Sequence, residues 1–147
     1  PPPPPAPPRP PRRSAQGVDS GRLAMLLAVL ERRAGVNLTQ HEVFASVVGG
    51  VKLSEPGADL GLCLALVSAV TNQPLAENLV ACGEVGLAGE LRQASNTARR
   101  LGEAARLGFT RAIIPASSAK DIKISGIKLQ PAETVAQALA LAGLTTK

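Results

Sequence analysis

The chain has 147 residues, of which 45% are hydrophobic and 18% charged, a length and composition sufficient for one domain with a hydrophobic core. It has no run of 18 apolar residues and no basic segment leading into an apolar one, so nothing predicts membrane insertion or secretion, and we expect a cytoplasmic protein. Two Phe and no Trp or Tyr exclude an aromatic platform for stacking single-stranded bases.

The net charge of +5 is concentrated in an N-terminal stretch. Arg9, Arg12 and Arg13 lie there without any acidic residue, so residues 14–147 carry 13 basic and 11 acidic groups, a net charge of +2. The folded part is therefore only mildly basic. Any contact with nucleic acid is expected to be local and directed at phosphates.

Residues 1–16 are Pro-rich and predict an extended tail or linker without a core, followed by one domain over residues 17–147. Asp19 or Ser20 can cap a first helix, which Gly35 ends. The apolar residues of this helix follow helical spacing: Leu23, Leu26, Leu27, Leu30 and Ala34. Its other face is polar, and either solvent or a partner would satisfy it: Arg22, Glu31, Arg32 and Arg33.

Residues 41–48 alternate and are rich in β-branched side chains, which predicts a strand, and Gly49-Gly50 marks a bend before residues 51–53. His41 is the only histidine and lies at a strand edge, where we expect no catalytic role. A loop over residues 54–59 then leads into a helix from about Ala58 to Thr71. This helix is apolar on nearly every face, so we expect it to be buried at the centre of the domain.

Residues 79–82 and 85–91 are predicted as strands, and Gly86-Leu87-Ala88-Gly89 is more typical of a hairpin than of a phosphate loop. Ser95 or Asn96 can cap the next helix, which runs to about residue 107 and ends at Gly108. Its predicted buried residues are Ala98, Leu101, Ala105 and Leu107. Its predicted outward residues are Arg99, Glu103 and Arg106, with Arg100 beside them.

Residues 111–114 and 122–129 predict two further strands, and Pro131 is placed in the first turn of a last helix. This helix continues through Val135 and Leu139 and ends at Gly143. Strands interleaved with helices of these lengths predict a two-layer α/β (α+β) domain.

Several segments resemble the proteolytic domain of Lon proteases. They are Pro56-Gly57-Ala58 with the helix that follows, residues 83–90, and Ala112-Ile113-Ile114-Pro115. The resemblance needs no gap from residue 56 to residue 115, and it covers most of residues 41–142. Residues 17–31 and 47–52 are similar to the C-terminal Lon-like domain of a family of bacterial DNA-repair proteins. The implied fold is the two-layer Lon proteolytic-domain fold, which is like domain 2 of ribosomal protein S5.

The resemblance also places the catalytic positions of the family. Lon-type peptidases use a Ser-Lys dyad, in which a lysine of lowered pKa takes the proton of the attacking serine. Gly57 stands at the serine position and Arg100 at the lysine position. Glycine has no nucleophile and arginine stays protonated near neutral pH, so we expect no catalysis by this route. Ser54 and Lys52 flank the same loop, but in the open, where lysine stays protonated.

Other chemistry has weaker support in the sequence. No nucleotide-binding Gly-rich motif is present. Cys63 and Cys82 are expected to be free core thiols rather than a disulfide, and with His41 as the only additional ligand they predict no metal site. Four carboxylates near the loop have no spacing that singles out an acid–base pair, and they are expected at the surface: Glu55, Asp59, Glu84 and Glu90.

In the similar DNA-repair family, the resemblance implies a zinc motif and a RecA-like ATPase joined to this domain. The whole protein would be a hexameric, DNA-dependent ATPase that drives branch migration, with ATP, magnesium and zinc bound outside this chain and a RecA-type recombinase as a partner. This chain would shape the ring and contact DNA without being an enzyme. The candidate DNA-binding residues are Arg99, Arg100, Arg106, Arg22, Arg32 and Arg33.

Two alternatives to this function remain. The first is an active Ser-Lys peptidase of the Lon type. The second is a module that binds a small anion at the helix N-terminus near Gly57, where backbone N–H groups and the helix dipole favour negative charge.

Overall fold

The computed structural model describes residues 2–3, 20–37 and 56–146. Residues 1 and 4–16 of the N-terminal tail, the strand expected at 41–48 and the bend at Gly49-Gly50 lie outside these ranges, as do His41, Lys52, Ser54 and Glu55. The elements are α1 (Ser20–Ala34), η1 (Pro56–Ala58), α3 (Asp59–Thr71), β1 (Leu79–Ala81), β2 (Glu84–Val85), β3 (Leu91–Arg92), α4 (Thr97–Arg106), β4 (Arg111–Pro115), α5 (Ala116–Ala119), β5 (Lys128–Ala132) and α6 (Val135–Leu141).

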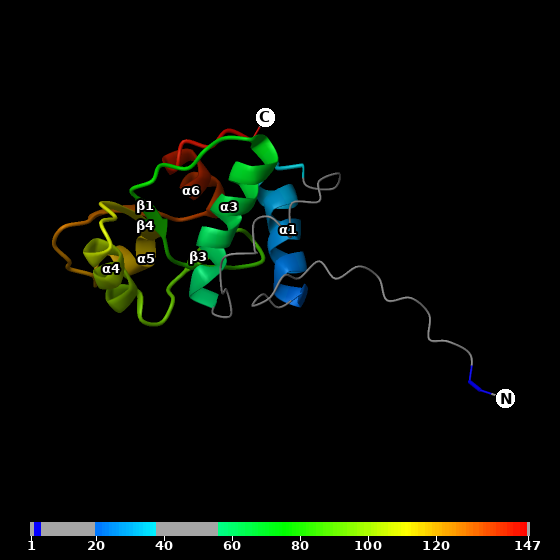
Figure 1. Ribbon diagram of the computed structural model, residues 1–147, viewed down its shortest axis with the longest axis horizontal. Helices are drawn as coiled ribbons and strands as arrows, with labels where there is room; N and C mark the ends of the chain where they lie inside the picture. Colours follow the sequence, from blue (N-terminus) through cyan, green and yellow to red (C-terminus); the bar gives the residue numbers. More distant parts are fainter. Residues whose placement is uncertain (1, 4–19, 38–55, 147) are drawn as a thin grey trace.

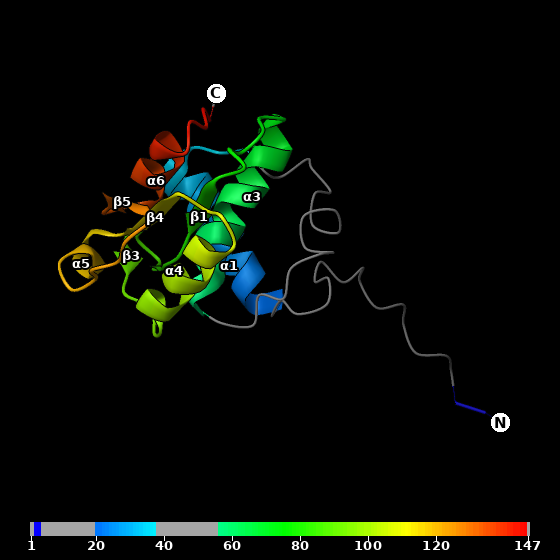
Figure 2. The same cartoon turned by 60° about the vertical axis from the view of Figure 1, so that its left-hand side comes forward.

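A parallel sheet of order β1-β4-β5 lies between two groups of helices (Figures 1 and 2). Because successive side chains of a strand point to opposite faces, β4 contributes to two cores. Ile113 packs with α1, α3 and α6, whereas Ala112 and Ile114 pack with α4. A separate antiparallel hairpin pairs β2 with β3. The mixed α/β class predicted from the sequence is confirmed.

Helix α3 is the centre of the larger core. Of its 13 residues seven are buried, and the helix packs against α1, α6, β1 and β2. Its predicted burial and its predicted end at Thr71 are therefore confirmed. It ends at Asn72, which adopts the left-handed conformation with φ 53° and donates its N–H to the carbonyls of Ser68 and Ala69. Asparagine tolerates that conformation better than most residues other than glycine.

A buried ion pair joins α1 to α3. Asp59 is only 2% exposed, and its carboxylate accepts hydrogen bonds from Arg22 Nε at 2.5 Å and Arg22 Nη2 at 2.9 Å. The same carboxylate accepts a third hydrogen bond from the backbone N–H of Val85 at 3.1 Å. Asp59 is thus not the surface carboxylate expected from the sequence. Arg22 is engaged in the fold, which removes it from the candidate DNA surface.

The segment predicted as one strand over residues 85–91 is instead a hairpin. Strands β2 and β3 are joined by a turn in which Gly86 donates to Glu90 O and Gly89 donates to Gly86 O, each at 2.9 Å. Gly89 has φ +82°, which a side chain disfavours. The sequence alternates, but two glycines within seven residues break the strand, as the expected hairpin chemistry of residues 86–89 implied.

The C-terminal strand and helix are both displaced from their predicted positions. Strand β5 begins at Lys128, so residues 122–127 form a loop, and Pro131 lies within β5 opposite Ile114. Proline is tolerated there because, among the described residues, β5 pairs with β4 alone and is an edge strand. Helix α6 starts only at Val135, where the Thr134 hydroxyl accepts from Gln137 N at 3.1 Å. The short helix α5 was not predicted.

Helix α4 buries partly different residues from those predicted, although Leu101 is buried and Arg99, Glu103 and Arg106 are exposed as expected. Its buried residues are Thr97, Leu101 and Ala104, whereas Ala98 is exposed and Leu107 is 76% exposed. The Thr97 hydroxyl donates to Ala94 O at 2.7 Å, which fixes the first turn and its phase. The predicted side-chain cap is wrong, because Asn96 adopts φ 63° and makes no capping bond. Gly108, with φ +99°, follows the helix end as predicted.

The ion pair between α1 and α3 yields a stability prediction. Arg22→Ala leaves the buried Asp59 carboxylate without its partner, and we expect a loss of about 3 kcal/mol in the free energy of unfolding. Arg32→Ala, on the exposed side of the same helix, is the control and should change stability by less than about 0.5 kcal/mol. Urea unfolding followed by circular dichroism measures both. Equal stability of the two variants would contradict a structural role for the pair.

Candidate functional site

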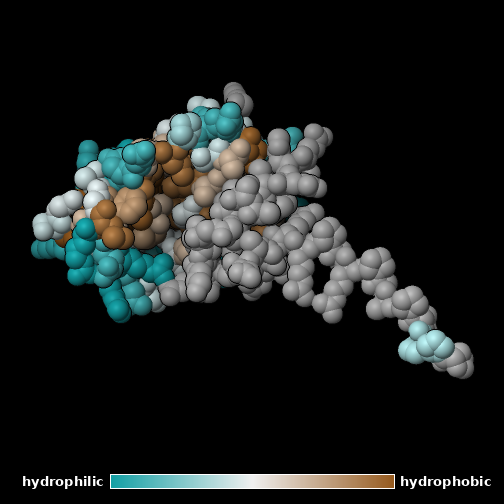
Figure 3. All heavy atoms as spheres, viewed as in Figure 1, coloured by the Kyte–Doolittle hydropathy of each residue, from teal (hydrophilic) through white to brown (hydrophobic). Residues whose placement is uncertain are grey.

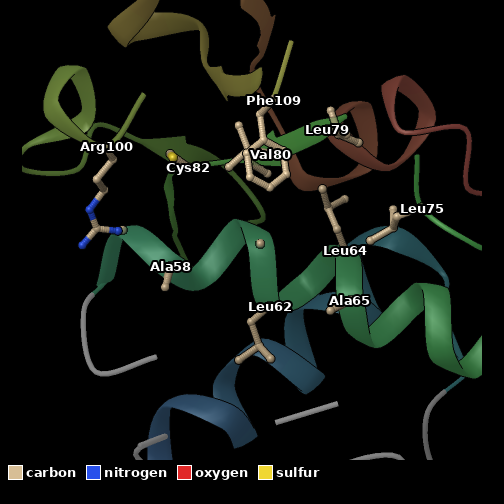
Figure 4. Close-up of a pocket in the computed structure, with 13 residues that line it drawn as sticks. Ala58, Leu62, Leu64, Ala65, Leu75, Leu79, Val80, Cys82, Arg100 and Phe109 are labelled. Carbon is tan, nitrogen blue, oxygen red and sulfur yellow. The ribbon is translucent and has the colours of Figure 1, made fainter. Parts of the chain in front are cut away.

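The structure brings Gly57 and Arg100 into contact. Gly57 lies in η1, directly before α3, and Arg100 extends from α4 toward the start of α3 (Figure 4). A Cβ atom added at Gly57 would lie 3.1 Å from Arg100 Nη1, 3.4 Å from Arg100 Cζ and 3.0 Å from Ala94 Cβ. Residues 43 positions apart in sequence therefore meet at one point, as the gapless resemblance to Lon proteases requires.

Backbone hydrogen bonds hold Gly57 in this place. The N–H of Gly83 donates to Gly57 O at 2.9 Å, and the N–H of Leu60 donates back to Gly83 O at 3.0 Å. Gly83 follows β1 and packs closely on Pro115, since a Cβ at Gly83 would lie 3.0 Å from Pro115 Cγ. The entry into α3 is thus fixed against the ends of β1 and β4, and it is not free to move away from Arg100.

Neither residue of this pair can perform the chemistry of a Ser-Lys dyad. Gly57 carries no nucleophile, and a guanidinium group is not suited to act as the general base that takes a proton from a serine. The guanidinium also takes the space beside Gly57 in which a serine side chain would begin. The alternative residues Ser54 and Lys52 lie outside the described residues.

An apolar groove of about 390 Å³ begins at Gly57 and runs between α3 and β1. Its walls are the side chains of Leu62, Leu64, Val80 and Phe109, and Arg100 lies at one end (Figure 4). The volume is within the range of about 300–1,000 Å³ found for small-molecule pockets. Figure 3 shows the apolar surface as a band beside the hydrophilic α4 end.

The two cysteines are free and buried, which confirms that prediction. Burial raises the pKa of the Cys82 thiol, which lines the groove, to about 11. Little of it is therefore thiolate at neutral pH. Burial, and then the nearby charge of Asp59, raises the pKa of the Cys63 thiol even further. Neither thiol is poised to act as a substitute nucleophile at neutral pH.

The structure separates the candidate DNA-binding arginines. Arg99 and Arg106 are exposed on the outer face of α4, where Arg106 pairs with Glu103, whereas Arg100 faces Gly57. Arg32 and Arg33 are exposed at the end of α1. Sequence reasoning missed the pairing of Arg22 with Asp59, for which the signal was an acidic residue at the start of an otherwise apolar helix.

Residues 2–3, 20–37 and 56–146 contain neither a cluster of metal ligands nor a helix that could cross a membrane. In these ranges no group of three His, Cys, Asp or Glu side chains is placed to hold a metal ion. No helix in the same ranges is both long and apolar enough to span a bilayer.

Comparisons with known proteins agree with the geometry. The family model described as Lon protease (S16) C-terminal proteolytic domain matches residues 34–142. DNA repair protein RadA of Haemophilus influenzae is 46% identical over 129 residues, which cover 88% of this chain and 28% of that protein. DNA repair protein RadA of Mycobacterium tuberculosis is 45% identical over 127 residues, which cover 86% of this chain and 26% of that protein. The chain therefore spans little more than a quarter of the curated relatives that it matches.

The contact between Gly57 and Arg100 predicts a coupled pair of mutations. Gly57→Ala introduces a Cβ at 3.0–3.1 Å from its neighbours and should destabilise the fold by about 1–3 kcal/mol. In an Arg100→Ala background the cost should fall by at least about 0.5 kcal/mol, because only the Ala94 contact remains.

The control for this pair is Gly102→Ala. A Cβ at Gly102 meets only Ile124 Cδ1 at 4.0 Å, so this change should be neutral or stabilising. Urea unfolding of the double-mutant cycle gives the coupling energy. A Gly57→Ala cost that does not depend on residue 100 would contradict the contact.

Proposed function

The chain belongs to the family of the Lon protease C-terminal proteolytic domain, and on this premise we propose that it is the non-catalytic Lon-like domain of a RadA-type DNA-repair protein. In this role it contributes to assembly and contacts DNA rather than cleaving peptides. The observation that carries the proposal is the guanidinium of Arg100 against Gly57. A domain that has the Lon fold but lacks both catalytic side chains would function through its surface.

The absence of peptidase activity rests on chemistry at two positions. Restoring a serine at residue 57 would crowd Arg100 and Ala94, and restoring a lysine at residue 100 would leave no nucleophile to activate. Changing either residue back alone would therefore not restore a Ser-Lys dyad. Cys82, the nearby thiol, has a pKa raised by burial to about 11 and offers no replacement.

Contact with DNA is supported by exposed cations without base-reading chemistry. Arg99 and Arg106 on α4 are exposed, Arg32 and Arg33 on α1 are an exposed alternative contact, and the sequence has no Trp or Tyr that could form an aromatic platform. Such residues bind phosphates, so one domain is expected to bind weakly and without sequence preference. Repetition of the same contacts in a ring would raise the effective concentration and strengthen binding.

Self-association, as a six-fold ring in the full-length protein, is the second part of the proposal. Leu87 and Leu107, which are 74% and 76% exposed, are apolar side chains that an interface could cover. The full-length protein would be a cytoplasmic, DNA-dependent ATPase for branch migration that cooperates with a RecA-type recombinase. Its ATP, magnesium and zinc would be bound by parts outside this chain.

The small-anion alternative has less support. The start of α3 already holds a negative charge, because the Asp59 carboxylate is buried in its first turn. The N–H of Leu60 in that turn is also engaged, because it donates to Gly83 O. The start of α3 therefore offers an incoming anion fewer backbone donors than an uncapped helix N-terminus does.

The first test of this proposal is peptide hydrolysis. We expect no cleavage of fluorescent casein or of peptide libraries by the unmodified chain, because no activated nucleophile is present at residue 57. Gly57→Ser with Arg100→Lys need not restore activity, since residues beyond the dyad also bind substrate. Cleavage that is lost in a Ser54→Ala variant would contradict the proposal and identify a relocated dyad.

The second test combines light scattering with a titration of labelled duplex DNA across a salt series. We expect a cyclic assembly and a logarithm of affinity that falls linearly with the logarithm of salt concentration, because phosphate contacts release counterions. Two duplexes of unrelated sequence should bind equally. A strict monomer at high concentration, in this chain and in the full-length protein, would contradict the assembly role, and absent DNA binding would contradict the contact role.

A further inference from the structure

Building on the proposed function, we infer that the DNA backbone is contacted by a surface that α4 shares with the loop before β5. This surface, the α4–loop surface, consists of Arg99, Arg106, Lys120 and Lys123. Neither lysine was singled out in the sequence. The inference names one end of the domain as the contact and excludes the arginines of α1 from it.

The charge of the folded part is strongly uneven. Residues 97–128 carry seven basic and two acidic side chains, a net charge of +5. The remainder of the domain, residues 17–96 and 129–147, carries six basic and nine acidic side chains, a net charge of −3. The mild net charge of +2 thus averages a cationic end with an acidic remainder. A polyanion approaching this domain is attracted to the α4 end and repelled elsewhere.

Packing joins the two elements of this surface. Ile122 and Ile124 pack against the core cluster that contains Leu101 and Ala104 of α4. Between and beside them Lys120 and Lys123 are exposed, so the loop turns its apolar side to the helix and its lysines to solvent. In Figure 1 this loop and α4 lie at the end of the described fold opposite α1.

Gly102 is the position at which the loop before β5 rests on α4. A Cβ at Gly102 would lie 4.0 Å from Ile124 Cδ1, so the loop rests on the helix at the position where no side chain intervenes. Arg99 precedes Gly102 by three residues and Arg106 follows it by four, and such residues are its neighbours on the helix surface. Lys123, next to Ile124 in the sequence, is therefore carried by the part of the loop that rests on this stretch of α4, and exposed Asp121 is the one acidic residue of the same loop.

Most of these cations have no internal partner. Within residues 20–37 and 56–146 no carboxylate forms an ion pair with Arg99, Lys120 or Lys123, and Arg106 pairs only with the exposed Glu103. Exposed pairs of this kind contribute little, about 0–1 kcal/mol, and exchange readily for a phosphate. Four long cations beside a single exposed apolar side chain, Leu107, suit a repeating phosphate backbone better than a shaped protein interface.

The test uses the full 147-residue chain and removes two positive charges either from the α4–loop surface or from α1. Lys120→Ala/Lys123→Ala should lower the slope of log affinity against log salt by about two and weaken binding of a short labelled duplex roughly tenfold or more at low salt. Arg32→Ala/Arg33→Ala loses the same net charge from α1 and should bind nearly as the wild type does. Lys120→Arg/Lys123→Arg should retain the wild-type slope, because it keeps the charges.

The possible outcomes distinguish a failure of this inference from a failure of the proposed function. If the wild type binds DNA and the two double-alanine variants weaken it equally, the α4–loop surface is not the contact and the inference is overturned. If the lysine variant alters only the oligomer mass, the surface binds another protein subunit, which also overturns it. If the wild type binds no DNA at any salt concentration, the DNA-contact role itself is wrong. Thermal unfolding checks that every variant is folded.

Discussion

A carboxylate buried at the first residue of the most apolar helix sets the geometry of this domain. Asp59 cannot stay charged inside the core without partners, and Arg22 of α1 and the N–H of Val85 in β2 supply them. One side chain thereby fixes α1, α3 and the hairpin relative to one another. Gly57 lies only two residues before Asp59, so the same constraint positions the degenerate site.

The sequence was sufficient to predict the central helix and the two residues of the candidate site. Helix α3 followed from a run of apolar residues, and the pairing of positions 57 and 100 followed from an ungapped resemblance. It failed where distant contacts decide. The partner of Asp59 is 37 residues away in the chain, and Pro131 is accommodated by the position of β5 at a sheet edge. The first turn of α4 is fixed by a nearer contact, the hydrogen bond from the Thr97 hydroxyl to Ala94 O. None of these is visible as a periodicity.

The exchange of a Ser-Lys pair for Gly57 and Arg100 is a coupled change in volume as well as in chemistry. Gly57, which has no side chain, leaves room for Arg100, which is longer than a lysine. The Arg100 guanidinium then occupies the space that a serine side chain at residue 57 would need. Close packing makes such a pair hard to revert one residue at a time, because either single reversion leaves a clash or a gap. Under the proposed function, the pair would therefore be retained as a unit.

The proline in β5 bears on how copies of this domain can associate. Among the described residues β5 pairs with β4 alone, and its other side presents a strand from which Pro131 removes one N–H donor. Exposed Lys128 adds a charge to the same strand. Proline and lysine at an open edge discourage a neighbouring strand from adding to the sheet and protect a concentrated protein from aggregation. Subunits would then associate through side-chain surfaces rather than by extending one sheet.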